Sequence, residues 1–291
     1  MNVLSCFDGM SCGQLALHRA DIKVNNYFAS EVDTHAIKVT QANFPSTRQL
    51  GDIQKVTKAQ TGQIDLLIGG SPCQGFSFAG RNLNFDDPRS KLFFEFVRLK
   101  EELKPKYFLL ENVRMKKESQ DIISKYMGCQ PVLINSSLVS AQNRQRMYWT
   151  NIPFTMPEDK QIVLSDILLN EVDTKYFAGE KLQENYTGGD QLNPNYKSQA
   201  NTIHCSKGKF GTLCAGTHGY SNGYVSNPIQ SKGKGFRQVT PLECERLQTV
   251  PEGYTNHVSD TQRYKMLGNG WTVDVISSIF EGLNNQQGQT A

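Results

Sequence analysis

The sequence lacks several features that would assign it to a familiar class of protein. No apolar segment approaches the length needed to cross a membrane, so we expect no membrane association. The N-terminus has no basic region followed by a long apolar run, so we expect no signal peptide. The cysteine count is seven, an odd number, and no Cys-x-x-Cys pair occurs. These cysteines favour reduced thiols in the cytoplasm over a disulfide framework.

Two further absences concern ligands. The first strand–turn–helix segment lacks Gly-x-Gly-x-x-Gly, which disfavours a nicotinamide-dependent oxidoreductase. Cys205, Cys214 and His218 lack a clear fourth ligand, so we expect no metal site. The net charge of +3 is too small to indicate a partner by itself, so the distribution of charge matters more.

Acidic residues are missing between Gln191 and Leu242. That stretch instead carries basic residues, with seven glycines and several aromatic residues interleaved; the basic residues are Lys197, Lys207, Lys209, Lys232, Lys234 and Arg237. This composition favours contact with a polyanion, above all a nucleic acid. A loop-rich surface domain is the alternative interpretation. Further upstream, Pro153 and Pro157 mark a boundary at which the character of the sequence changes.

Strands and helices alternate over the first half of the chain, which predicts a mostly parallel sheet with helices on both faces. We expect strands at 2–7, 25–30, 64–68, 107–110 and 131–139, and helices at 14–20, 34–43, 90–103 and 118–127. Two more helices are expected at 240–248 and 272–283, the first capped by Thr240 with Glu243 in a capping box.

Polar residues follow the predicted strands and should converge on one edge of the sheet. Glu31 lies about 20 residues beyond the glycine turn, where a carboxylate suits a ribose diol. The alternative role is a helix N-cap, for which Asp33 is better placed. Asp52 could accept from an exocyclic amine with Ile53 packing on a base, although Asp52 also suits an ordinary turn.

Cys73 follows the buried strand at 64–68 and stands next to Pro72, at the position of a nucleophile. Cysteine is also a common small core residue. Arg144 and Arg146 alternate, so on an extended segment they share one face and could clamp an anion or a base. A solvated edge strand is the alternative. The polar segment 80–88 is predicted to be a loop over the site.

In their residues and their order along the chain, segments of this sequence resemble the motifs of the cytosine-C5 DNA methyltransferase family. The matching segments are Phe7-Asp8-Gly9, Ser71 to Ser77, Asp87-Pro88-Arg89 with Leu92-Phe93, Glu111-Asn112-Val113, Gln142 to Arg146, Arg237 to Pro251, and Gly268-Asn269. Gly9-Met10-Ser11-Cys12 departs from the usual first motif and resembles the eukaryotic de novo branch. Gly270-Trp271 departs from the usual last motif. The resemblance as a whole suggests a bacterial or phage enzyme.

The resemblance implies a class I methyltransferase fold, which is Rossmann-like and α/β, with a smaller, loop-rich target-recognition domain. We expect a catalytic and cofactor-binding domain at 1–153, the recognition domain at 154–235, a return to the catalytic domain at 236–283 and a disordered tail at 284–291.

The family's chemistry assigns roles to the matching residues. Cys73 would add to C6 of cytosine, Glu111 would act at N3, and Arg144 and Arg146 would hold O2 and the adjacent backbone. S-adenosylmethionine is the implied methyl donor. Its expected pocket consists of Phe7, Asp8, Gly9, Glu31, Val32, Asp52, Ile53, Pro72, Leu92 and Asn269.

The implied substrate is double-stranded DNA from which the target cytosine is flipped out, because C5 and C6 are stacked inside a duplex. We expect a monomer in the cytoplasm, associated with the nucleoid through DNA. The resemblance also allows a cognate restriction endonuclease as a partner. An RNA cytosine-C5 methyltransferase is the main alternative. Retention of Cys73, Glu111 and both arginines disfavours a non-catalytic homologue.

Overall fold

The computed structural model describes residues 1–72, 88–179, 190–191, 198–216, 219–226 and 235–284. It divides the chain into two compact units. The first unit contains 1–134, 145–156 and 273–291; the second contains 135–144 and 157–272. Residues 236–272 therefore pack within the second unit, whereas 236–283 were expected to return to the catalytic domain. The functional domain boundaries themselves stay a prediction. The predicted tail, apart from Asn284, lies outside the described residues.

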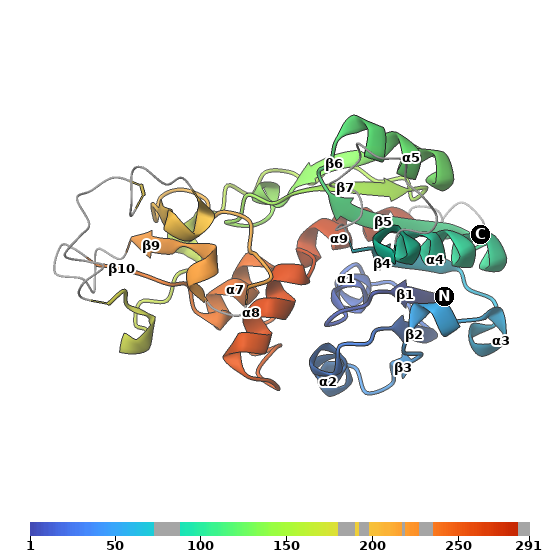
Figure 1. Ribbon diagram of the computed structural model, residues 1–291, viewed down its shortest axis with the longest axis horizontal. Coiled ribbons are helices and arrows are strands. Elements are labelled where there is room, and N and C mark those ends of the chain that lie inside the picture. The colour runs from blue at the N-terminus through green and yellow to red at the C-terminus, as the bar shows by residue number, and fades with distance from the viewer. Residues whose placement is uncertain (73–87, 180–189, 192–197, 217–218, 227–234, 285–291) are drawn as a thin grey trace. The chain divides into compact units, whose positions relative to one another are not determined.

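A seven-stranded sheet forms the centre of the first unit (Figure 1). Its strands are β1 (Asn2–Cys6), β2 (Asn26–Ser30), β3 (Arg48–Gln49), β4 (Leu66–Gly70), β5 (Tyr107–Val113), β6 (Val132–Asn135) and β7 (Gln145–Thr150). The strand order is β3-β2-β1-β4-β5-β7-β6. The first five strands pair in parallel, and β7 runs antiparallel to β5. The predicted α/β fold with a mostly parallel sheet is confirmed.

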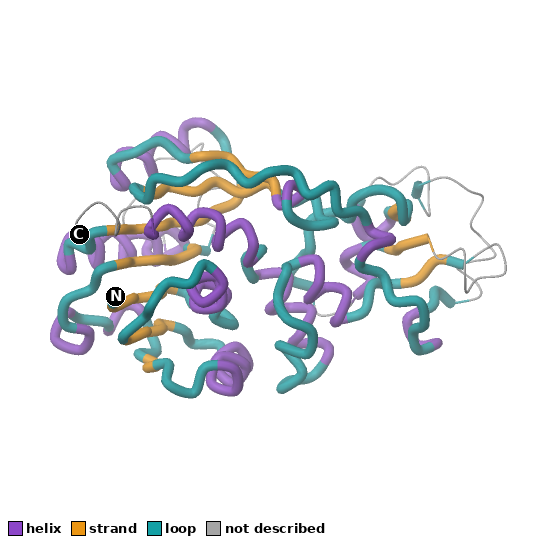
Figure 2. The backbone as a smooth tube through the Cα atoms, turned by 180° about the vertical axis from the view of Figure 1, so that it is seen from behind, coloured by secondary structure: helices purple, strands orange, loops and turns teal. Residues whose placement is uncertain are grey.

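Helices lie on both sides of these strands (Figure 2). They are α1 (Cys12–Arg19), α2 (Thr34–Asn43), α3 (Lys58–Thr61), α4 (Pro88–Leu103), α5 (Lys117–Met127) and α9 (Val273–Phe280). The first and last of these, α1 and α9, pack against each other. Among the described residues, no helix is both long and apolar enough to span a membrane.

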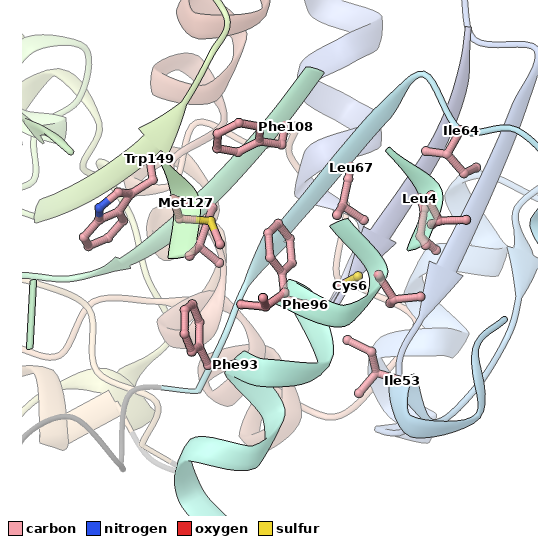
Figure 3. Packing of buried hydrophobic residues seen from close by; sticks show 14 of the residues in the cluster. Leu4, Cys6, Ile53, Ile64, Leu67, Phe93, Phe96, Phe108, Met127 and Trp149 are labelled. Carbon is pink, nitrogen blue, oxygen red and sulfur yellow. The ribbon is translucent and has the colours of Figure 1, made fainter. Parts of the chain in front are cut away.

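The main core of the first unit lies between the sheet and α4. Figure 3 shows Phe93 and Phe96 projecting from α4 among strand residues such as Leu67 and Phe108. Trp149 of β7 belongs to the same cluster and is fully buried. Since burial of one large apolar side chain contributes about 1.5–3 kcal/mol, this cluster is a main source of the sheet's stability.

Local hydrogen bonds explain where some elements begin and end. Asp33 caps α2 by accepting from the backbone N–H groups of His35 and Ala36 at 2.9 and 3.4 Å, which confirms its predicted role. The expected strand at 131–139 was too long. The Asn135 side chain accepts from the N–H of Ser137 and the N–H of Arg144, and this turns the chain into a short 3-10 helix.

The described residues of the second unit form a small sheet and two α-helices. Its strands are β8 (Ile203–His204), β9 (Tyr224–Ser226) and β10 (Phe236–Arg237), and its helices are α7 (Pro241–Leu247) and α8 (Asp260–Asn269). The capping box of Thr240 and Glu243 at α7 is confirmed. Helix α8 was missed, because only Tyr264, Met266 and Leu267 supply large buried apolar side chains to it.

Candidate active site

A glycine turn follows β1 and leads into α1. Phe7, Gly9 and Ser11 all have positive φ angles, 58°, 58° and 64°. Glycine adopts this left-handed region freely, whereas phenylalanine and serine do so at a cost that local contacts must offset. Within this turn, the N–H of Gly9 donates to Oε2 of Glu31 at 2.7 Å. The turn is thus fixed to the end of β2.

Glu31 is held in one orientation by the backbone around it. Its Oε1 accepts from the N–H groups of Val32 and Asp33 at 2.7 and 2.9 Å. Val32 itself is 70% exposed, an unusual environment for an aliphatic side chain. A fixed carboxylate can bind the ribose of a nucleoside, and an exposed aliphatic side chain beside it can pack on the base.

Asp8 is a buried carboxyl at the back of the same turn. It is 8% exposed, and Oδ1 accepts from the Tyr27 hydroxyl at 2.8 Å. Oδ2 has no hydrogen-bond partner among the described residues. Burial raises the pKa of Asp8 to about 6, while hydrogen bonds from Ser5, Tyr27 and Ser11 act in the opposite direction.

The other predicted cofactor residues of the first unit differ in exposure. Asp52 caps a 3-10 helix through the N–H of Gln54 at 3.0 Å. Ile53 is 4% exposed and belongs to the core cluster, and Leu92 is half-buried against that cluster. Pro72 is exposed. The Ile53 side chain therefore makes core contacts, and its packing on a ligand base stays a prediction.

Glu111 lies at the carboxyl end of β5, opposite Gly70 of β4. Nε of Arg146 on β7 lies 3.0 Å from Oε1 of Glu111, and both side chains are nearly buried. The Asn112 amide donates to the carbonyl and the hydroxyl of Ser71, each at 3.2 Å. These contacts place an acid, a guanidinium and the start of the Ser-Pro-Cys segment at one edge of the sheet.

Cys73 and the predicted loop at 80–88, except for Pro88 at the start of α4, lie outside the described residues. Their predicted roles stay predictions. The chain does bring Pro72, the residue before Cys73, to the end of β4. The position of Cys73 itself stays a prediction.

Arg144 belongs to the second unit and lies just before β7. It is 3% exposed, and its guanidinium donates to the carbonyls of Leu213, Gly268 and Gly270 at 3.1, 3.1 and 2.9 Å. Asn269, the predicted cofactor residue, is the last residue of α8. The catalytic role predicted for Arg144 remains untested.

Two buried side chains with evident roles were not found from the sequence. Tyr27 holds Asp8, and the Gln248 amide contacts the carbonyls of Leu267 and Gly270. Tyr27 is an ordinary strand residue by pattern, so no sequence signal marked it. Gln248 lies in the matching segment from Arg237 to Pro251, and that match was the one signal that marked it.

A parallel sheet with a glycine turn, an acid fixed at the end of the second strand and a Glu-Asn-Val strand end defines a class I, Rossmann-like methyltransferase. The chain belongs to the C-5 cytosine-specific DNA methylase family, whose model matches residues 1–285. The protein is therefore an enzyme, a DNA (cytosine-5-)-methyltransferase, and its family implies S-adenosylmethionine as methyl donor.

Individual relatives agree with this assignment. The chain is 33% identical to type II methyltransferase M1.ScrFI of Lactococcus lactis subsp. cremoris, over 96% of this chain and 77% of that protein. It is 31% identical to type II methyltransferase M.NlaX of Neisseria lactamica, over 96% and 95%. The structure of Entamoeba histolytica methyltransferase EhMeth matches with a TM-score of 0.79 at 18% identity, covering 99% of this chain and 98% of that chain. The last comparison bears on the fold alone.

Proposed function

We propose that the protein methylates carbon 5 of a cytosine flipped out of duplex DNA, through a covalent bond between Cys73 and C6. The observation that carries this proposal is the pair of Glu111 and Arg146, 3.0 Å apart at the end of β5. The neighbouring Asn112 holds Ser71, two residues before Cys73. An acid, a guanidinium and a cysteine segment at one sheet edge suit activation of a pyrimidine ring.

The chemistry explains why these residue types are needed. Carbon 5 of cytosine is a poor nucleophile, and addition of a thiolate at C6 makes it reactive. Glu111 hydrogen-bonds N3 during this addition, and Arg146 holds both O2 and the Glu111 carboxylate. We also assign Arg144 to the site, through the backbone that it holds. After methyl transfer, loss of the C5 proton expels Cys73 and restores the ring.

Within this proposal, the methyl donor binds the first unit at the glycine turn. Glu31 would bind the ribose, Val32 and Phe7 would pack on the adenine, and Asp52 would accept from its amine. The fixed Glu31 carboxylate and the exposed Val32 support this fit. The remaining predicted contacts come from Asp8, Gly9, Ile53, Pro72, Leu92 and Asn269. S-adenosylmethionine supplies an electrophilic methyl group when bound.

Recognition of DNA is assigned to the residues from about 154 to 235. The part of this region after Gln191 has no acidic residues, which supports an electrostatic attraction to phosphate and makes affinity dependent on salt. Extrusion of the base costs a few kcal/mol, and the segment at 80–88 is the proposed lid over it. The monomeric state, a cognate endonuclease and a position at the nucleoid stay predictions.

The reaction is tested by bisulfite sequencing of DNA from cells that express the protein. We expect protected cytosines at one recurrent sequence, and none with Cys73→Ser. Cys205→Ser is the matched control, since Cys205 is an exposed thiol of the second unit. Near-normal methylation by Cys73→Ser would refute the mechanism, and methylation of tRNA but not of duplex DNA would replace DNA by RNA as substrate.

Formation of the covalent bond is tested with duplex DNA that carries 5-fluorocytosine. Fluorine cannot leave C5 as a proton does, so the adduct should persist and migrate as a complex in denaturing gels. We expect this complex with the wild-type protein and S-adenosylmethionine, and not with Cys73→Ser. Active enzyme that forms no adduct would contradict attack by Cys73.

A further inference from the structure

Two buried glutamines of the second unit bind the backbone at the end of α8. Gln142 and Gln248 have no exposed surface. The Gln248 amide donates to the carbonyls of Leu267 and Gly270 at 2.7 and 3.2 Å. Its Oε1 accepts from the Thr272 hydroxyl at 2.8 Å. One side chain thus spans the whole junction between α8 and the segment that follows it.

Gln142 connects this junction to the segment at Leu213. Its amide donates to the carbonyl of Leu247 at 3.1 Å and to Oε1 of Gln248 at 3.3 Å. Its own Oε1 accepts from the N–H of Leu213 at 2.8 Å. Both polar ends of the Gln142 side chain are therefore used, and the two glutamines form one connected network.

Arg144 holds the same backbone from the Leu213 side. Its guanidinium bridges the carbonyl of Leu213 to those of Gly268 and Gly270. The approach is so close that a Cβ on Gly268 would lie 2.2 Å from the carbonyl oxygen of Cys214. The backbone on both sides of Asn269 is therefore fixed by close packing and by hydrogen bonds.

This arrangement solves a general problem at helix ends. The last four carbonyls of an α-helix have no partner within the helix, and they carry partial negative charge. At α8, buried side chains satisfy carbonyls of Leu267, Gly268 and the following Gly270. Because these carbonyls accept from buried glutamine and arginine side chains and not from water, the end of α8 is held more firmly than a solvated helix end, which can fray.

We propose that Gln142, Arg144 and Gln248 are positioning residues, which fix the end of α8 so that Asn269 is held ready for the methyl donor. The inference rests on the proposed function, because the role of Asn269 belongs to the cofactor site. Asn269 itself is exposed between two anchored glycines. Its side chain is thus presented from a backbone that the three buried residues hold in place.

The test compares Gln248→Leu with Thr255→Val. Leucine keeps the volume of Gln248 and removes its hydrogen bonds. Thr255 is equally buried in the second unit. Its hydroxyl donates to Glu245 and accepts from Nε of Arg263 near the start of α8, away from the C-terminal end of α8, so Thr255→Val is the matched control. Binding of S-adenosylhomocysteine is measured by calorimetry, because it requires no methyl transfer. Gln248→Leu should weaken binding about tenfold or more, since buried donors and acceptors lose their partners.

Three further readouts separate positioning from general destabilisation. KM for S-adenosylmethionine should rise while kcat at saturating donor stays within about threefold, as for loss of ground-state binding. DNA affinity should not change. Trp271 is partly exposed and Trp149 is fully buried, so acrylamide quenching reports mainly on the segment after α8, and it should increase. Thr255→Val should change none of these readouts.

Arg144→Lys provides a second variant if Gln248→Leu does not fold. Lysine keeps the charge but cannot bridge three carbonyls in the same plane. It should also weaken S-adenosylhomocysteine binding, by a smaller factor. Wild-type affinity in both variants, or equal losses in the variants and in Thr255→Val, would overturn the inference alone. A wild-type protein that neither binds S-adenosylhomocysteine nor methylates DNA would overturn the proposed function with it.

Discussion

Replacement of Asp8 by asparagine should stabilise the protein at neutral pH. Asparagine keeps the shape of the side chain and an oxygen that accepts from Tyr27, but it removes the charge. In the folded protein the pKa of Asp8 is raised from its ordinary value of 3.8 to about 6, mainly because the carboxyl is buried. The charged form of Asp8 is therefore less favourable in the folded protein than in the unfolded chain.

The magnitude follows from the difference between these pKa values. One pKa unit corresponds to about 1.4 kcal/mol, so the charged Asp8 costs about 3 kcal/mol of folding free energy, as an upper estimate. Below the unfolded pKa both states bind the proton, and the cost is absent. Between 3.8 and about 6 the folded protein holds the proton that the unfolded chain has lost, so stability falls as pH rises. Above about 6 the full cost is present.

The measurement is urea unfolding of the wild type and Asp8→Asn at several pH values from about 3.5 to 7.5. The difference in unfolding free energy between the two proteins should change in favour of Asp8→Asn by up to about 3 kcal/mol across that range. Glu101→Gln, on the exposed surface of α4, is the control for loss of one carboxylate. A difference for Asp8→Asn that does not change with pH, or that changes no more than the difference for Glu101→Gln, would refute the reasoning.

Three other substitutions test the second unit. Arg237→Met removes the bidentate partner of the Glu243 carboxyl group in a fully buried site, so thermal or urea unfolding should show a loss of about 3–5 kcal/mol. Thr240→Ala removes the cap of α7 and should cost about 1 kcal/mol by the same measurement, and no loss would show that the cap contributes nothing. Gly268→Ala forces a methyl group against the carbonyl of Cys214; we expect low soluble yield or a Tm several degrees lower, and a wild-type Tm would contradict the close packing.

Much of the first unit could be predicted from sequence because its signals are local. A short apolar run ended by glycine predicts a strand such as β4, and Asp33 predicts the start of α2. The convergence of Glu31 and Glu111 on one edge follows from parallel strands. Helix α8 escaped prediction because tertiary packing, and not an apolar stripe, stabilises it.

The contacts of single side chains could not be predicted in the same way. Arg144 and Arg146 alternate in sequence, but Arg144 precedes β7 and bonds backbone carbonyls far along the chain, whereas Arg146 pairs with Glu111. The bond from Tyr27 to Asp8 depends on the distance between β2 and the glycine turn. Such partners are fixed by the folded geometry, and periodicity carries no information on them.

The packing of α1 against α9 has a consequence for the order of events during synthesis. Helix α1 is complete at Arg19, but its partner begins at Val273, and Arg19 forms an ion pair with Asp274. At ribosomal speeds, roughly 10–50 seconds separate the two. Throughout that time the apolar face of α1 lacks its α9 partner. The first unit therefore begins to form early in synthesis, but it is completed only after α9 has been made.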